Sequence, residues 1–562
     1  YVLGREDGTP KTPAWASPKC GIPEWTIKAL ARQFAAKVTS ILHYFGGGLI
    51  RGAWSHEPGR LEVVMLGMQG LGKPGVHQAR VAYHGLPRDD APKGVREAVE
   101  AGFFFPCEEN DRIRRTHAAS HRTYSRQVIM KTLIQDAILN PPVSFYGRGE
   151  IGAPVEDQFK RYTYPIPKEE GGTEIHMIWT DTPCRTTCWN DGMRTIEAMR
   201  SPKIECVVAQ HPWLENDCLL ADIILPSNTT FEVDDIVSNT LRGNETPSMT
   251  FQKKAIEPIG ESMSDYEVVL EIAKKMGVYD QVTQGKSVPE WIKEVFDKSG
   301  LGKLVSWEDF QEKGYYVFSP AEGWENDPAG LYEFYKDPEG HALKTPSGKL
   351  EFYSERLARY FPDDNERPPS PQWIEKGITL DERLTSYRAR KYPLLMMSNH
   401  GRWREHSQAD DISWTREALT CKIMGLDGYM YEPCWIHPTT AAGRGIRNGD
   451  IVNAYNERGG VLGGAYVTER IMPGVVYMDH GARCDWIVPG ELDRGGAINL
   501  ISPGGTTSKN AGGQATSGYL VEVKKVPAAQ MEEWKEKYPE AFERDYDPAT
   551  GPLFNGWVEG GM

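Results

Sequence analysis

Residues 435–481 read WIHPTTAAGRGIRNGDIVNAYNERGGVLGGAYVTERIMPGVVYMDHG, and this stretch decides the fold of the C-terminal part of the chain. A Gly-Asp turn precedes the strand-like run Ile451–Tyr455, and a second turn at 456–460 leads into a strand-like run that ends near Thr468. A Pro-Gly turn then leads into Val475–Met478. Three short strands joined by tight turns predict a small β-barrel or β-sandwich rather than a helical layer.

The region before this stretch alternates strands with a helix. Because a strand, a helix and a second strand in succession form a βαβ unit, we expect a parallel sheet there. The predicted strands are His176–Thr180, Glu205–Gln210 and Ile223–Leu225, and the predicted helix is Met193–Arg200. Helices are also predicted at Pro23–Lys37 and at Tyr266–Met276, the second with a capping box formed by Ser264 and Glu267.

These elements predict a multidomain α/β protein, with Rossmann-like parallel-sheet domains and a C-terminal β-barrel module. The predicted parts are an α/β dinucleotide-binding domain at 1–245 with an irregular segment at 85–170, a mixed α/β domain at 246–389 that completes the central sheet, the β-barrel module at 390–526, and a tail at 527–562.

Composition excludes several classes of protein. The 562 residues are enough for several domains, and 40% apolar and 25% charged residues are ordinary for a globular protein. A net charge of -14 disfavours nucleic acid as a partner. No apolar run approaches the ~20 residues of a membrane span. The nine cysteines contain no C-x-x-C pair, so we expect no iron–sulfur cluster or structural zinc site in this chain.

The N-terminus reads like the interior of a protein. The chain begins at Tyr1 and lacks the charged and apolar regions of a signal peptide. We therefore expect that an N-terminal portion precedes Tyr1 in the natural polypeptide, and we predict a cytoplasmic location.

The loop 181–190 follows the first strand of the predicted parallel sheet. Ligands of such sheets sit outside the carboxyl ends of the strands, and the N-terminus of the next helix suits a phosphate. Arg185 adds a planar charge that matches pyrophosphate, although no G-x-G-x-x-G is present. The alternative is a solvated connecting loop, and the Cys184–Cys188 segment reads as a loop. The candidate cofactor-binding residues here are Asp181, Thr182, Arg185 and Asn190.

The ends of the next two strands should reach the same edge of the sheet. Gln210 and His211 end one strand, and Pro226 ends the other, so all three are candidate cofactor-binding residues. The alternative is a buried strand pair in which His211 is structural.

A dense polar cluster at 398–407 follows the strand Leu394–Met397. Arginine neutralises phosphate, and Asn and Ser bond the edge of a purine or pterin. The alternative is a charged surface loop. The candidate residues are Asn399, Gly401, Arg402, Trp403, His406 and Ser407.

A glycine-rich loop at 508–514 is the fourth candidate. Its glycines let backbone amides approach a ligand closely, and the alternative is a flexible loop. The candidate residues are Asn499, Lys509, Asn510 and Gln514. Because no G-x-S-x-G, H-E-x-x-H or P-loop is present, the residues alone predict a large α/β enzyme that binds a phosphate-rich cofactor.

Several segments resemble one known family. They are MQGLGKPG at 68–75, ADIILPSNTTFE at 221–232, TPSGKLEFYS at 345–354 and IHPTTAAGRGIRNGDIVNAYNERG at 436–459. Together they are similar to the dimethyl sulfoxide reductase family of molybdopterin oxidoreductases, and the likeness covers most of residues 1–526. The resemblance implies a double-psi type of barrel. It also implies two molybdopterin guanine dinucleotides, held by the four clusters above, that chelate one molybdenum or tungsten.

Within that family, three further segments resemble transhydroxylases of hydroxylated aromatics: residues 1–12, 255–267 and 493–503. This likeness implies an iron–sulfur, ferredoxin-like partner subunit that carries [4Fe–4S] clusters. It also places the metal's protein ligand and the main catalytic residues upstream of this chain, so the resemblance implies no metal ligand within it. Tyr83 and His84 are the catalytic candidates within it, as a phenol and an imidazole near the substrate.

Three functions stay open at this point. The first is the catalytic-subunit portion of a transhydroxylase-like molybdenum or tungsten enzyme that acts on hydroxylated aromatics. The second is a terminal reductase or dehydrogenase of the same family that passes electrons through an iron–sulfur subunit. The third is a non-catalytic cofactor-binding subunit.

Overall fold

The computed structural model describes the chain except for residues 45–50, 82–126, 148–154, 239–247, 299–300, 318, 320–321, 324–325, 327–329, 376–380, 409, 411–414, 416, 544, 547–552 and 555–562. The predicted catalytic residues Tyr83 and His84 lie outside the described residues.

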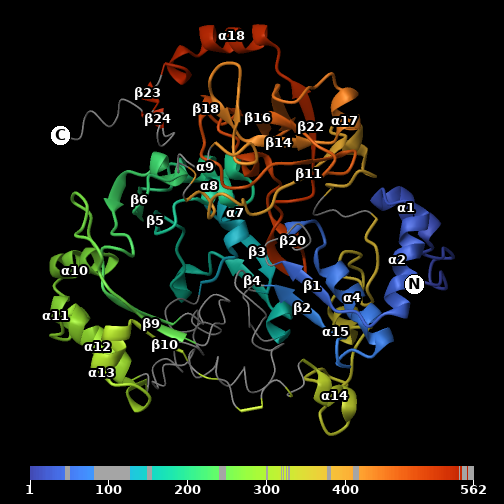
Figure 1. Cartoon of the computed structure of the whole chain (residues 1–562), viewed down its shortest axis with the longest axis horizontal. Coiled ribbons are helices and arrows are strands. Elements are labelled where there is room, and N and C mark those ends of the chain that lie inside the picture. Colours follow the sequence, from blue (N-terminus) through green and yellow to red (C-terminus); the bar gives the residue numbers. More distant parts are fainter. Residues whose placement is uncertain are drawn as a thin grey trace.

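A closed six-stranded β-barrel forms the C-terminal part of the molecule (Figure 1). Its strands pair in the order β14-β17-β11-β22-β15-β16, and β16 pairs back onto β14 with Cys434 opposite Ala465, which closes the barrel. The pairs β11–β17 and β14–β16 are parallel and the other four pairs are antiparallel. The barrel strands are β11 (Leu394–Met397), β14 (Pro433–Ile436), β15 (Ile451–Asn456), β16 (Gly459–Val467), β17 (Val475–Tyr477) and β22 (Tyr519–Lys525). The predicted β-barrel and its three predicted strands are confirmed.

The barrel interior is filled by small and branched side chains. Every second residue of β15 is buried, among them Val452 and Ala454, which is the period-two pattern of a strand with one face in a core. Six successive residues of β16 are buried, because the other side of the barrel is covered as well. There Leu462 packs with Met531 of the tail helix α18 (Ala528–Lys537). Full burial of a large apolar side chain, such as Val452, Leu462 or Met531, stabilises the fold by about 1.5–3 kcal/mol.

A three-stranded parallel sheet lies beside the barrel. Its order is β5 (Met177–Thr180), β6 (Cys206–His211), β7 (Ile223–Pro226), and α9 (Gly192–Met199) connects the first two strands. The predicted βαβ unit is therefore confirmed. Figure 1 shows α8 (Arg185–Cys188) and α9 between this sheet and the barrel.

The interpretation of 181–190 as a loop is wrong at its centre. The N–H of Cys188 donates to the carbonyl of Cys184 at 2.8 Å, and the N–H of Trp189 donates to the carbonyl of Arg185 at 3.1 Å, which makes α8 one turn of helix. Cys184 and Cys188 therefore lie one above the other on the same face.

The remaining segments form smaller units around these two. The predicted helix at 23–37 and the predicted capping box of Ser264 and Glu267 are both confirmed. In the described residues, β9 (Ser248–Gln252) is the central strand of a separate antiparallel sheet, between β10 (Tyr315–Val317) and β8 (Asp235–Ser238). A parallel bridge between Ser227 and Met263 connects the segment after β9 to the end of β7. In the described residues, this bridge is the contact by which the segment extends the parallel sheet. The predicted domain boundaries stay predictions.

The other helices and strands have the following bounds: α1 (Pro13–Cys20), α2 (Glu24–Ala36), β1 (Ile41–Tyr44), α4 (His56–Gln69), β2 (Gln78–Val81), α7 (Ile134–Leu139), β3 (Val143–Tyr146), β4 (Arg161–Tyr164), α10 (Asp265–Met276), α11 (Tyr279–Thr283), α12 (Val288–Lys298), α13 (Trp307–Lys313), α14 (Tyr332–Lys336), α15 (Glu355–Tyr360), β12 (Ile423–Met424), β13 (Met430–Tyr431), α17 (Pro438–Ala442), β18 (Trp486–Val488), β19 (Leu492–Asp493), β20 (Thr506–Ser508), β21 (Ala511–Gln514), β23 (Asp545–Tyr546) and β24 (Leu553–Phe554). None of the helices in the described part of the chain has the length and apolar character needed to cross a lipid bilayer.

Candidate functional site

Three segments meet where the carboxyl edge of the parallel sheet faces the mouth of the barrel. They are α8, the loop 398–408 after β11, and the segment 478–482 after β17. The N–H of Gly481 donates to the carbonyl of Thr187 at 3.2 Å, and the N–H of His480 donates to the carbonyl of Asn399 at 3.1 Å. The side-chain amide of Asn216 donates to Thr187 Oγ1 at 2.6 Å and to the carbonyl of Ala482 at 3.4 Å. We call this region the junction.

Cationic side chains surround α8 at the junction. The guanidinium of Arg185 lies 4.5 Å and the ammonium of Lys131 lies 4.7 Å from the centre of the Trp189 ring. Arg51 donates from Nη1 to Gln514 Oε1 at 3.2 Å. Burial lowers the pKa of Lys131, and the charges of Arg51 and Arg185 lower it further. Three cations that repel one another in a partly buried place favour a bound polyanion.

The N-terminus of α8 is already occupied by a side chain of the protein. Asp217 accepts from the N–H of Arg185 at 2.8 Å, from the N–H of Thr186 at 3.1 Å and from Thr186 Oγ1 at 2.8 Å. A carboxylate thus already satisfies the N–H groups at the start of α8. The prediction of a phosphate at a helix N-terminus concerned the helix at 193–200, and it stays a prediction. The group of this loop that suits an anion is the guanidinium of the Arg185 side chain.

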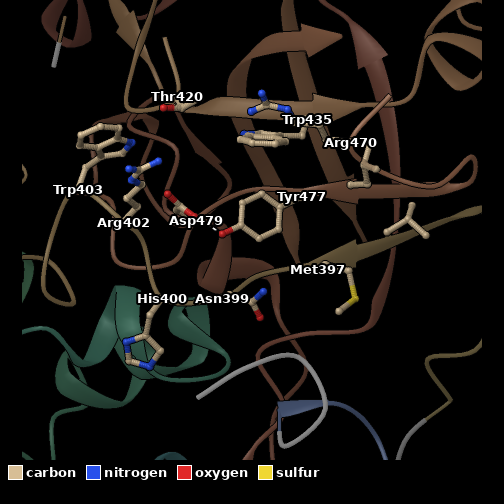
Figure 2. A pocket seen from close by; sticks show the side chains of 12 residues that line it. Met397, Asn399, His400, Arg402, Trp403, Thr420, Trp435, Arg470, Tyr477 and Asp479 are labelled. Atoms are coloured by element: carbon tan, nitrogen blue, oxygen red, sulfur yellow. Dashed lines mark hydrogen bonds between the residues drawn. The ribbon is translucent and has the colours of Figure 1, made fainter. Parts of the chain in front are cut away.

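A cavity of about 460 Å³ opens at the barrel end of the junction (Figure 2). Figure 2 shows Trp403 and Arg402 on one side, Trp435 and Tyr477 on the other, and Asp479 between them. Tyr477 donates its hydroxyl to Asp479 Oδ1, and among the described residues it is the one hydrogen-bonding donor to that carboxylate. The lining residues are Met397, Asn399, His400, Arg402, Trp403, Thr420, Trp435, Arg470, Ile471, Val475, Tyr477 and Asp479.

The charge of this cavity is mixed. Arg402 and Arg470 carry positive charge, and the Arg402 guanidinium lies 5.0 Å from the centre of the Trp403 ring. Burial raises the pKa of Asp479, while the charge of Arg404 lowers it. Two indoles, a carboxylate and two guanidinium groups in one cavity suit a flat, hydrogen-bonding ring that carries phosphates.

A buried network of ion pairs holds the loop 398–408 in place. The Arg404 guanidinium bonds Glu432 Oε1 at 2.6 Å and Asp410 Oδ1 at 2.9 Å, and the Lys422 ammonium contacts the same two carboxylates. Arg404 Nε also donates to the carbonyl of His480 at 3.0 Å. The network therefore ties the loop to the segment after β17 and holds both in place.

A second cavity of about 580 Å³ lies under the glycine-rich loop. Lys509 and Asn510 line it, together with Tyr146 and Arg367. Lys509 Nζ lies 3.0 Å from Asp364 Oδ1 and 2.9 Å from Glu366 Oε2. Two carboxylates of the chain thus balance the charge of Lys509, which weakens it as a phosphate ligand.

The predicted cofactor residues fall into four groups. Asn399, Arg402 and Trp403 line the first cavity, with Gly401 in the same loop, and Lys509 and Asn510 line the second. Arg185, Asn190, Gln210, His211, His406, Ser407, Asn499 and Gln514 lie within or around the junction. Asp181 and Thr182 are exposed, and Pro226 is exposed at the end of β7. Their roles as cofactor ligands stay predictions.

Several of these side chains already bond protein groups. Asn190 donates to the carbonyls of Pro503 at 3.2 Å and Gly505 at 2.9 Å. Gln210 bonds Trp179 Nε1 at 3.1 Å and Asp265 Oδ1 at 2.7 Å, so both ends of its amide are used. Asn190 thus ties the end of α8 to the segment 503–505, and Gln210 ties β6 to β5 and α10.

Buried amide atoms without a partner test whether a cofactor fits this place. Among the described residues, Asn399 Oδ1, Asn499 Nδ2 and Gln514 Nε2 are buried and make no hydrogen bond. Leaving such an atom unsatisfied costs about 1–3 kcal/mol, so native proteins pair nearly all of them. An acceptor and two donors left open near the mouth of the barrel fit a ligand rich in nitrogen and oxygen.

The sequence analysis missed several residues of the site. Trp435, Arg470, Tyr477 and Asp479 line the first cavity, and Arg51 and Lys131 lie at the junction. Asp479 had a signal, since it directly follows the predicted strand Val475–Met478 in the same way as the other polar clusters follow theirs.

Comparison with known proteins agrees with this geometry. Residues 394–517 match the molydopterin dinucleotide binding domain, and residues 116–275 match molybdopterin oxidoreductase. The pyrogallol hydroxytransferase large subunit of Pelobacter acidigallici is 32% identical over 93% of this chain and 64% of its own length. The trimethylamine-N-oxide reductase of Haemophilus influenzae is 29% identical over 93% of this chain and 59% of its own length. The dimethyl sulfoxide/trimethylamine N-oxide reductase of Cereibacter sphaeroides is 30% identical over 94% of this chain and 60% of its own length.

The chain thus spans about three fifths of the length of the curated relatives it matches. A solved structure, acetylene hydratase from Pelobacter acetylenicus, aligns with a TM-score of 0.44 and 19% identity, over 62% of this chain and 44% of that chain. The two domain matches and the relatives point the same way, and the chain belongs to the molybdopterin oxidoreductases of the dimethyl sulfoxide reductase family.

Proposed function

We propose that this chain is the cofactor-holding portion of the catalytic subunit of a molybdenum or tungsten enzyme with two molybdopterin guanine dinucleotides. One observation carries the proposal: a cavity with two indoles, two arginines and a carboxylate opens beside buried amide atoms that lack partners. When bound, the dinucleotides supply a dithiolene-ligated metal at which the bond-making and bond-breaking steps take place. The protein supplies binding and orientation.

The first cavity is proposed to hold the guanine end of one dinucleotide. The Asp479 carboxylate accepts hydrogen bonds, and the Watson–Crick edge of guanine offers two adjacent N–H donors to such an acceptor. The faces of Trp403 and Trp435 suit the base as stacking surfaces. Arg402 and Arg470 would balance the phosphates next to it.

The junction is proposed to hold the pyrophosphate and the pterin of the same arm. Arg51, Lys131 and Arg185 supply the positive charge. The unpartnered amide atoms of Asn399 and Gln514 would bond the heteroatoms of the pterin edge. The second cavity, which Asn510 and Arg367 line, is the proposed place of the second dinucleotide.

The proposed reaction is a transhydroxylation between hydroxylated aromatics with no net oxidation. The supporting observation is the 32% identity to a pyrogallol hydroxytransferase, against 29% and 30% for two reductases. The small difference also favours a second candidate, a reductase or dehydrogenase that passes electrons through an iron–sulfur subunit. The name "large subunit" of the first relative supports a smaller partner, which we propose carries [4Fe–4S] clusters. We place the assembly in the cytoplasm.

The test uses the holoenzyme, that is, the assembled protein with its natural cofactors. Molybdenum, tungsten and the guanine nucleotide released by acid are counted per chain, and two nucleotides per chain are expected. Asp479→Asn should lower nucleotide retention about tenfold to hundredfold, because the new amide group faces the donors of the base. Asp297→Asn on the exposed face of α12 is the matched control and should keep both nucleotides.

Nucleotide retention and substrate turnover decide the proposal. Nucleotide-free wild-type protein, or equal retention in both variants, contradicts the binding role. Hydroxyl transfer between polyphenols without added electron acceptor supports the transhydroxylase. Turnover of N-oxides or reduced dyes together with inactivity toward polyphenols replaces it with the reductase.

A further inference from the structure

Tyr477 lies beside the Asp479 carboxylate in the wall of the first cavity. Both residues line that cavity, and Tyr477 is the last residue of β17, two positions before Asp479. The hydroxyl of Tyr477 donates to Asp479 Oδ1, and Figure 2 shows the oxygen of the Tyr477 ring pointing toward that carboxylate. Because no described residue donates a hydrogen bond to Asp479 Oδ2, the second oxygen is left for a ligand.

The barrel fixes the position of the Tyr477 ring. Tyr477 lies opposite Trp435 across the antiparallel strands β17 and β14, and the two ring centres are 5.7 Å apart with an interplanar angle of 75°. Tyr466 lies opposite Trp435 on the other neighbouring strand, β16, with its ring centre 4.9 Å from that of Trp435. The ring that carries the Tyr477 hydroxyl is therefore held by packing between strands rather than by a loop.

The loop after β11 holds the main chain of Asp479 and leaves room at its side chain. Arg404 Nη2 donates to the carbonyl oxygen of Asp479 at 3.2 Å, and Arg404 belongs to the buried ion network. A Cβ on Gly401 would lie 3.3 Å from Asp479 Oδ2, which is closer than an ordinary contact. The glycine at 401 therefore keeps this oxygen free of a neighbouring side chain.

Burial and hydrogen bonding have opposite effects on the charge of Asp479. Burial raises the pKa of Asp479, and the charge of Arg404 lowers it. The charge of Glu432 raises the same pKa, and the hydrogen bond from Tyr477 lowers it. Burial also raises the pKa of the Tyr477 phenol, so this group stays protonated and remains a donor. Tyr477 thus favours the ionised form of Asp479, in which both oxygens accept hydrogen bonds.

The charge and the orientation of a carboxyl group decide which base it matches. An ionised carboxylate offers two acceptors, which fit the two adjacent donors of guanine. A protonated carboxyl group offers one donor and one acceptor, which fit the edge of adenine or cytosine instead. Hypoxanthine lacks the exocyclic amino group of guanine and leaves one carboxylate oxygen unpaired. A site built to bond such a group discriminates strongly against the analogue that lacks it.

We propose that Tyr477 is a positioning residue that sets the choice of base: it holds Asp479 so that both carboxylate oxygens face two adjacent N–H donors. The inference rests on the proposed function of the first cavity, and it goes further by assigning the preference for guanine to a residue that acts through Asp479. Loss of the Tyr477 hydroxyl should therefore weaken discrimination between bases more than it weakens nucleotide binding as such.

Calorimetry of the cofactor-free full chain with guanosine diphosphate and inosine diphosphate tests the proposal. The two probes differ only in the exocyclic amino group of the base. The wild type should bind guanosine diphosphate about 10- to 150-fold more tightly, which is the range that a hydrogen bond to a charged group contributes. Tyr477→Phe should reduce this ratio to about a third or less, and it should change the affinity for inosine diphosphate by less than about twofold.

Tyr466→Phe is the matched control, because it removes a phenol hydroxyl from the same group of packed rings. It should keep the wild-type ratio. Tyr477→Met also lacks the hydroxyl and repeats the test if Tyr477→Phe does not fold. On the holoenzyme, the guanine nucleotide should be released faster from Tyr477→Phe than from Tyr466→Phe under mild denaturant.

The outcomes separate this inference from the proposed function. A ratio that falls in Tyr477→Phe and is kept in Tyr466→Phe supports the role of Tyr477. Equal ratios in Tyr477→Phe and the wild type, with guanosine diphosphate preferred in both, overturn that role and leave the guanine assignment intact. A wild type that binds both nucleotides equally, or binds neither, contradicts the guanine assignment and the inference together.

Discussion

Gly481 lies against the backbone of His406 so closely that a Cβ on Gly481 would stand 2.0 Å from the His406 carbonyl oxygen and 2.5 Å from its carbonyl carbon. Real Cβ atoms do not approach backbone atoms to that distance. Gly481 also has a φ of +81°, which favours glycine. The contact between the two barrel segments therefore depends on the missing side chain.

Gly481→Ala should push the loop 398–408 away from the segment after β17. We expect it to lower the free energy of unfolding by about 2–4 kcal/mol, since overpacking adds to the cost of the backbone conformation. Urea unfolding of the two proteins measures the difference. Gly490→Ala is the matched control, because Gly490 has a φ of +77° and its Cβ would meet nothing within 4 Å. That variant should cost about 1 kcal/mol, and equal costs for the two would refute the role of the contact.

Removing one charged group from the buried ion network is predicted to destabilise the folded protein strongly. Lys422→Met removes one of the two cations that contact both Glu432 and Asp410 in the described residues, so the variant should lose about 3–5 kcal/mol of stability. Lys525→Met removes an ammonium from the half-exposed pair with Asp450 and should cost less than about 1 kcal/mol. Thermal and urea unfolding compare the two. A decrease of less than 1 kcal/mol in the free energy of unfolding of Lys422→Met would show that the network does not stabilise the fold.

Trp403 should matter for the nucleotide more than for the fold. Stacking of a base on an aromatic side chain is worth about 1–3 kcal/mol, so Trp403→Ala should shorten nucleotide retention roughly 5- to 150-fold. The rate of nucleotide release from the holoenzyme under mild denaturant is the readout. Trp25→Ala changes an indole that is 73% exposed on α2 and should leave that rate unchanged. Similar rates in both variants speak against stacking at Trp403.

Asp493 should make stability fall as the pH rises. Its carboxyl group is buried and accepts from the N–H groups of Asp485 at 2.7 Å, Gly496 at 2.8 Å and Ala497 at 2.9 Å. Burial raises the pKa of Asp493 to about 7, against the lowering effect of these donors. The folded protein therefore binds more protons than the unfolded chain between its ordinary pKa of 3.8 and about 7, and the stabilisation is lost as the pH rises through that window.

The corresponding measurement is the free energy of unfolding in urea at pH 5 and pH 8. Relative to Asp493→Asn, the wild type should lose on the order of 2–3 kcal/mol over that interval. The variant removes the titrating group, so its own pH dependence serves as the baseline. Parallel curves for the two proteins would mean that the N–H donors keep Asp493 ionised throughout.

The barrel was predictable from sequence because its signal is local. Alternation along Ile451–Tyr455 and the Gly-containing turns on either side lie within a few residues of each other, and β15 and β16 form where they indicate. The strand ends that bear polar clusters follow from the same pattern, which is why Asn399, Arg402 and Trp403 were found.

The errors come from contacts that are distant in sequence. The helical turn α8 is too short to show a period, and the carboxylate that caps it, Asp217, comes 32 residues after Arg185. The charge of Lys509 is balanced by Asp364, which lies 145 residues before it. The contact between Thr187 and Gly481 likewise depends on how the parallel sheet and the barrel meet, which no local pattern records.

The most direct test of the central claim is a density map of the holoenzyme at a resolution that shows bases. The account predicts a guanine base in the cavity lined by Trp403, Trp435 and Asp479, with its hydrogen-bonding edge at the Asp479 carboxylate. A map in which that cavity is empty while both dinucleotides bind elsewhere would contradict it.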